Sequence, residues 1–123
     1  MNHMDPAVTM RRIEDLLSHV WMVRAFLKHS EEAEEDDELA EIHRTLYDCM
    51  LALGEPSQAG DAERYLKQAR KKFSKLRKAA EQFQELQPEV SGHMNFQMAA
   101  QSLTTAVHEI GAILQQNPLT GKS

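Results

Sequence analysis

Residues 61–87 read DAERYLKQARKKFSKLRKAAEQFQELQ, and apolar side chains recur in this stretch every three or four residues. That spacing places them on one face of an α-helix. The face consists of Ala62, Tyr65, Leu66, Ala69, Phe73, Leu76, Ala80 and Phe83. Because the pattern persists over about three heptads, we expect one long helix that buries this face against other helices. Pro88 follows, and we expect the helix to end before it.

Three other segments show the same spacing, and their predicted ranges are about 5–29, 37–53 and 91–116. Asp5 is a candidate N-cap, and a proline follows it at the first helical position. Gly54 is expected to stop the helix over 37–53, because glycine favours the backbone conformation that ends a helix. The other expected stop signals are Pro56, Asn117 and Pro118.

These segments predict an all-α fold, because no stretch alternates apolar and polar residues as a β-strand would. Short connections make consecutive helices antiparallel neighbours. We therefore expect a single domain over residues 1–123, built as an antiparallel up-down four-helix bundle, with a mobile tail at about 117–123. The acidic segment 31–41 is either a loop or a backward extension of the helix that starts near residue 37, since carboxylates favour a helix N-terminus.

Composition narrows the function classes. The net charge is −5, which disfavours non-specific nucleic-acid binding by the whole surface. The apolar stretches are too short to span a bilayer, so we expect no membrane partner. Cys49 is the only cysteine, which excludes an internal disulfide framework and favours a reducing compartment. The first residues lack the basic and apolar parts of a signal peptide, so we expect a cytoplasmic location.

The charges are segregated along the chain. Residues 31–41 hold eight carboxylates and no base, whereas residues 64–78 hold eight of the 14 lysines and arginines and no acid. At 100° per residue, five of these bases lie opposite the apolar face of their helix. They are Arg64, Lys67, Lys71, Lys75 and Lys78. Such a ridge predicts binding to an acidic protein surface. The alternatives are nucleic acid, although no aromatic residue is interleaved for stacking, and a solvated face matched by the acidic segment.

The helix predicted over 91–116 is poor in charge, with Glu109 as its only charged residue. Loss of charge with retained polarity is typical of a surface that meets another surface. We therefore predict a homodimer whose interface includes Gln97, Gln101, Thr104, Thr105 and His108. Met22 and Phe26 are predicted to point away from the apolar face of their own helix and to extend this interface.

Arg24 lies inside the apolar face of the helix over 5–29. A buried guanidinium without a partner is very costly, so we expect Arg24 to pair with a carboxylate or a tyrosine hydroxyl. The candidate partners are Tyr47, Asp48 and Glu109. Three interpretations stay open: a structural ion pair that sets the helix register, an anion site within the bundle, and an arginine whose head simply reaches water.

We find no pattern that predicts catalysis, a cofactor or a metal. The acidic segment lacks the glycine and the alternating spacing of a calcium loop. Neither Glu-x-x-His, His-x-x-x-His nor Cys-x-x-Cys occurs, so di-iron and zinc sites are not indicated. The sequence therefore predicts a non-enzymatic, homo-oligomeric interaction module.

One further segment, His43-Arg44-Thr45-Leu46-Tyr47, loosely resembles the motif of histidine phosphotransfer domains, which are four-helix bundles with a phosphorylatable histidine. Gly54 lies downstream, as the resemblance implies. That family has a lysine three residues after the histidine and then a glycine, where this chain has Leu46 and Tyr47. The resemblance implies a remote alternative function, a phosphotransfer-type bundle centred on His43.

Overall fold

The computed structural model describes residues 5–116, and this part of the chain is all-helical. The elements are α1 (Pro6–Lys28), α2 (Glu31–Glu35), α3 (Asp37–Gln58), α4 (Ala62–Val90) and α5 (Met94–Gln116). The predicted mobile tail over 117–123 lies outside the described residues. The four predicted helices correspond to α1, α3, α4 and α5 and begin close to their predicted starts. Helix α2 was not predicted as a separate helix.

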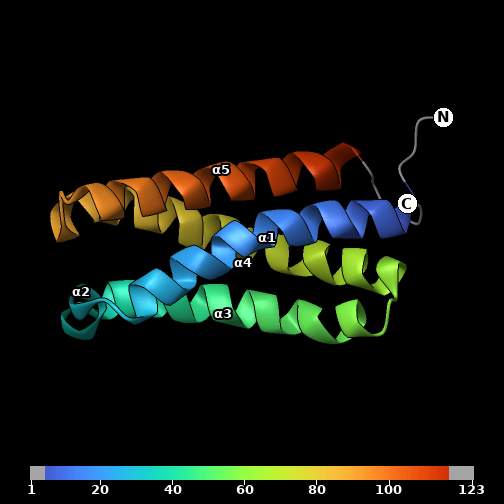
Figure 1. Ribbon diagram of the computed structural model, residues 1–123, viewed down its shortest axis with the longest axis horizontal. Coiled ribbons are helices and arrows are strands. Elements are labelled where there is room, and N and C mark those ends of the chain that lie inside the picture. The colour runs from blue at the N-terminus through green and yellow to red at the C-terminus, as the bar shows by residue number, and fades with distance from the viewer. Residues whose placement is uncertain (1–4, 117–123) are drawn as a thin grey trace.

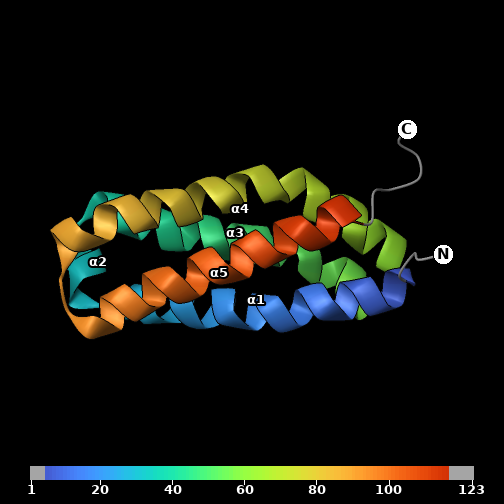
Figure 2. The ribbon, with the colours of Figure 1, turned by 90° about the horizontal axis from the view of Figure 1, so that it is seen from above.

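The four long helices lie along one axis, and each runs opposite to the one before it (Figure 1). In that view α5 lies above, α3 below, α1 in front and α4 behind, and Figure 2 gives the same arrangement from above. Helix α1 packs against α3 and α5, and α4 packs against the same two helices from the other side. These contacts are compatible with the predicted four-helix bundle.

Polar side chains cap the helix starts, as their positions in the sequence suggest. Asp5 Oδ1 accepts a hydrogen bond from the backbone amide of Ala7 at 2.9 Å, and Asp61 Oδ1 accepts one from Arg64 at 3.1 Å. Each bond satisfies an amide that the helix itself leaves unpaired. The loop between α3 and α4 turns at Gly60, whose φ of +68° lies in the left-handed region that glycine adopts without strain.

The acidic segment 31–41 is mostly helical, with one interruption. Ser30 caps α2, and Asp36 separates α2 from α3 in an extended conformation. Asp36 also caps α3, because its Oδ1 accepts the amide of Leu39 at 3.0 Å. The carboxylates of this segment therefore lie around two helix N-termini, where the helix dipole favours negative charge.

Two predicted helix ends are wrong. Helix α3 continues past Gly54 and contains Pro56, and α4 continues through Pro88 to Val90. Both prolines lie in the last turn, where each removes only one amide donor from a ladder that is about to end. Pro56 is also buried, so its packing against the core offsets the lost hydrogen bond.

A continuous apolar core fills the space between the long helices. Phe83 and Leu46 are completely buried at its centre, and Tyr65 is only 1% exposed. The Tyr65 hydroxyl is buried without a hydrogen-bond partner in the described part of the chain. A polar group of this kind costs stability, because it has lost water without gaining another partner.

Candidate functional site

Four lysines form an exposed row on α4, which we call the lysine ridge. Its members are Lys67, Lys71, Lys75 and Lys78. Within residues 5–116 none of the four makes an ion pair. Arg64, the fifth base predicted for this surface, lies at its end and is paired with Glu55 at 3.0 Å and Asp61 at 3.7 Å. The unpaired positive charge of the surface is therefore concentrated on the lysines.

The acidic segment does not neutralise the lysine ridge by direct contact. Helix α2 lies at one end of the molecule, beside the start of α3 (Figure 1). A groove of about 370 Å³ lies between α3 and α4. Glu41 and Asp48 line it from α3, and Lys75 and Lys78 line it from α4. No ion pair forms across it among the described residues, so these lysines remain available to another molecule.

The predicted interface residues of α5 lie on its outer side. Gln97, Gln101, Thr105 and His108 are exposed, and Thr104 is half-buried. Two residues that we did not predict join them, since Met94 is 59% exposed and Met98 is 50% exposed. Met94 and Met98 are four residues apart and lie outside the apolar face of their helix, and this spacing could have identified them as an exposed pair. The outer side of α5 thus combines amides, hydroxyls and apolar surface with little charge.

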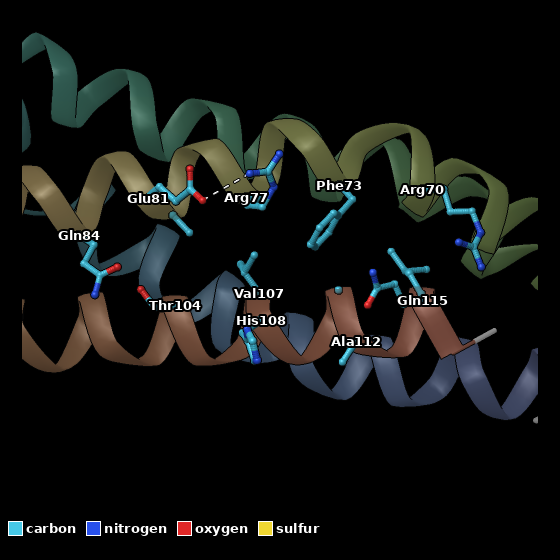
Figure 3. Close-up of a pocket in the computed structure, with 13 residues that line it drawn as sticks. Arg70, Phe73, Arg77, Glu81, Gln84, Thr104, Val107, His108, Ala112 and Gln115 are labelled. Atoms are coloured by element: carbon cyan, nitrogen blue, oxygen red, sulfur yellow. Dashed lines mark hydrogen bonds and ion pairs between the residues drawn. The ribbon is translucent and has the colours of Figure 1, made fainter. Parts of the chain in front are cut away.

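A groove of about 780 Å³ runs between α4 and α5 (Figure 3). Thr104 and His108 line it from α5, and Phe73 points toward α5 from its floor. A Cβ atom at Gly111 would come within 2.7 Å of the Phe73 Cζ atom, so glycine is needed for the ring to lie there. Across the groove, Arg77 pairs with Glu81 on its own helix at 3.4 Å. The predicted dimer surface therefore borders a hollow with an apolar floor.

Met22 and Phe26, which were both predicted to extend the dimer interface, differ in their exposure to solvent. Met22 is 65% exposed, as the sequence predicts. The ring of Phe26 instead packs against Phe96 of α5, with the ring centroids 4.9 Å apart and the planes at 63°. Phe26 is half-buried within the protein, and the prediction that it points away from the core is wrong.

Arg24 is half-buried, but its partners are aromatic rings. Its Cζ atom lies 4.6 Å from the centroid of the Trp21 ring and 4.5 Å from that of Tyr47. Its Nε is buried without a hydrogen bond in the described structure, and neither Asp48 nor Glu109 pairs with it there. Tyr47 was among the predicted partners, but the contact uses the ring face rather than the hydroxyl.

His43 is half-buried on α3, close to several cations. Burial lowers its pKa, and the positive charges of Arg44, Arg24 and Lys28 lower it further. A lowered pKa keeps the imidazole neutral at pH 7. This surrounding positive charge would attract an anion, but His43 lacks the lysine and glycine that the phosphotransfer motif requires.

Cys49 lies in the contact between α3 and α4 and is only 4% exposed. Its Sγ makes a long contact of 3.9 Å to the carbonyl oxygen of Lys72, which accepts a weak hydrogen bond from the thiol. Burial raises the pKa of Cys49, and this effect outweighs the opposing charges of Lys72 and Lys75. The side chain therefore has the character of a core residue rather than a nucleophile.

No group of three or more His, Cys, Asp and Glu side chains in the described part of the chain is placed to hold a metal ion. No helix within residues 5–116 has the length and apolar character needed to cross a membrane.

No protein-family model, curated protein or solved structure matches this chain.

Proposed function

We propose that the chain is a non-enzymatic interaction module, an antiparallel up-down four-helix bundle that self-associates and binds an acidic protein surface through the lysine ridge. The observation that carries the proposal is the contrast between cations. Arg44, Arg64 and Arg77 are each paired with a carboxylate of this chain, whereas the four ridge lysines are not. The ridge spans about 17 Å at 1.5 Å per residue, which suits an extended acidic surface.

The binding free energy that the lysine ridge can supply indicates its role. An exposed ion pair contributes only about 0.2–1 kcal/mol, so four of them supply a few kcal/mol at most. A millimolar complex already requires about 4 kcal/mol. The ridge therefore serves mainly to steer and orient an acidic partner, and its contribution falls as salt screens the charges.

Charge reversal on the ridge should abolish the salt-dependent binding. In the variant Lys67→Glu/Lys71→Glu, we expect affinity for a fluorescent oligoglutamate peptide to fall by at least about tenfold at low salt, since two attractive charges become repulsive. Fluorescence anisotropy measures the affinity. The matched control is Arg11→Glu/Arg12→Glu, which changes net charge equally through exposed cations of α1 and should bind nearly as the wild type does.

Equal losses in the two double variants would show that net charge, not the ridge, drives binding, and the proposal would fail. The same titrations with a DNA duplex test the alternative partner. Tighter binding to the duplex than to the peptide, lost in the ridge variant, would replace an acidic protein by nucleic acid. Circular dichroism of each variant confirms that the fold persists.

Self-association is proposed through the outer side of α5. Amides and hydroxyls lose less on leaving water than lysine or glutamate would, and they can form hydrogen bonds across a two-fold axis. The exposed methionines Met94 and Met98 add apolar area to this side. A small domain also gains stability when a dimer buries such surface.

New charge on α5 should split the dimer. Gln101→Lys/Thr105→Lys places cations near their own symmetry mates, so we expect dissociation at tens of micromolar protein. Light scattering should give twice the 14.0 kDa chain mass for the wild type and 14.0 kDa for the variant. As a control, Ser18→Lys/Gln58→Lys adds the same charge to exposed positions on α1 and α3 and should remain dimeric. A monomeric wild type would rule the α5 interface out.

A further inference from the structure

An exposed cluster of large side chains lies where α1 meets α3, and the proposed function does not use it. Trp21 is 42% exposed, Tyr47 37% and Leu51 62%. Arg24 lies against the two rings, whose centroids are 6.4 Å apart. We call these four residues the aromatic–arginine cluster. Trp, Tyr and Arg are the residue types most enriched at the energetic centres of protein interfaces.

Arg24 is held ready to bind a carboxylate. Its Cζ atom lies within 4.6 Å of both ring centroids, and these contacts restrict the side chain and partly remove it from water. Among the described residues it makes no hydrogen bond or ion pair through its terminal nitrogens. A guanidinium restricted in this way binds a carboxylate through two parallel hydrogen bonds at a reduced entropic cost.

The charge around the cluster selects an acidic ligand. Lys28 follows Arg24 by one turn on α1, and Arg44 precedes Tyr47 by three residues on α3. These charges act together on the neighbouring His43, whose pKa is lowered by burial and then by Arg44, Arg24 and Lys28. Glu41 pairs with Arg44 at 3.2 Å and offsets one of the three cations. Arg24 and Lys28 make no ion pair among the described residues.

We propose that the aromatic–arginine cluster is a docking site for an amphipathic helix of a partner protein, with a carboxylate on Arg24 and an apolar side chain on Trp21, Tyr47 and Leu51. The seam between two neighbouring helices can receive such a helix lengthwise, and its apolar anchors would recur every three or four residues. This site lies on α1 and α3, whereas the lysine ridge lies on α4, behind α1 in Figure 1. The proposal therefore stands without the ridge.

The test uses the full chain and a phage-displayed library of randomised helical peptides. We expect the selected peptides to combine Asp or Glu with apolar residues at helical spacing. Because Trp21 is the only tryptophan, binding of a selected tryptophan-free peptide should change the intrinsic fluorescence in a saturable way. Affinity should fall at least about tenfold in Leu51→Gln, which removes an exposed anchor, and in Arg24→Lys, which keeps the charge but loses the paired donors.

Two controls locate the site. Met22→Gln removes a side chain of similar exposure elsewhere on α1, and Lys67→Glu/Lys71→Glu disrupts the lysine ridge. Both should bind the peptides as the wild type does. The proposal is overturned if no peptide is selected, if Leu51→Gln binds normally, or if only the ridge variant loses binding. It is also overturned if light scattering shows that Leu51→Gln dissociates a dimer, because the cluster would then be covered by a second copy.

Discussion

Replacing Phe83 by alanine should lower the free energy of unfolding by about 3–5 kcal/mol. The ring is completely buried on α4 within the apolar core, so its loss removes contacts and leaves a cavity that the surrounding helices fill only in part. A domain of this size is stable by only about 5–15 kcal/mol, so the variant approaches the limit of folding. Urea unfolding followed by circular dichroism measures the difference.

Met22→Ala is the matched control for Phe83→Ala. It also removes a large apolar side chain, but Met22 is 65% exposed and its loss should change stability by no more than about 0.5 kcal/mol. Similar midpoints for Phe83→Ala and the wild type would mean that α4 does not bury its apolar face as described.

Alkaline pH should destabilise the protein through Tyr65. Burial raises the pKa of this phenol above its ordinary value, and the negative charge of Glu14 raises it further. Above about pH 10 the unfolded chain loses the phenolic proton while the folded chain keeps it. The folded state then binds more protons, so its stability falls with pH by about 1.4 kcal/mol per unit. At pH 12 the loss from this residue reaches about 3 kcal/mol.

The comparison of Tyr65→Phe with the wild type isolates this loss. The variant lacks the titrating group, so its advantage over the wild type should grow between pH 10 and pH 12. It also removes a buried hydroxyl without a hydrogen bond in the described structure, so it should be no less stable at pH 7. A constant difference between Tyr65→Phe and wild type across this range would contradict the assignment.

Periodicity in the sequence predicts the buried faces well. Of the apolar face predicted in residues 61–87, most members are buried and Ala62 and Phe73 are partly buried against the core; the buried members are Tyr65, Leu66, Ala69, Leu76, Ala80 and Phe83. The predicted N-cap Asp5 is also confirmed, because capping depends on side chains a few residues apart. Both the buried face of a helix and its N-cap depend on residues that are close in the sequence, so the sequence pattern is enough to predict them.

Features that depend on contacts between helices were harder to predict. Gly54 was expected to end α3, but the helix continues because α1 and α4 pack along it and Pro56 is buried. The position of Phe26 depends on the presence of Phe96 across the seam with α5. Tyr47 was predicted as a partner of Arg24 through its hydroxyl, but the contact uses the ring, and Trp21 on the same helix as Arg24 adds a second ring. The exposed surfaces proposed to bind partners remain predictions.

The reactivity of the Cys49 thiol reports how often α3 and α4 separate. The single thiol is closed off between α3 and α4, and its raised pKa keeps it protonated there. A thiol reagent can react only during the moments when the two helices separate. With fast reclosing, the labelling rate divided by that of an exposed cysteine equals the fraction of time that this seam is open. The natural cysteine thus records how often α3 and α4 separate under native conditions, and no residue has to be substituted to introduce a labelling site.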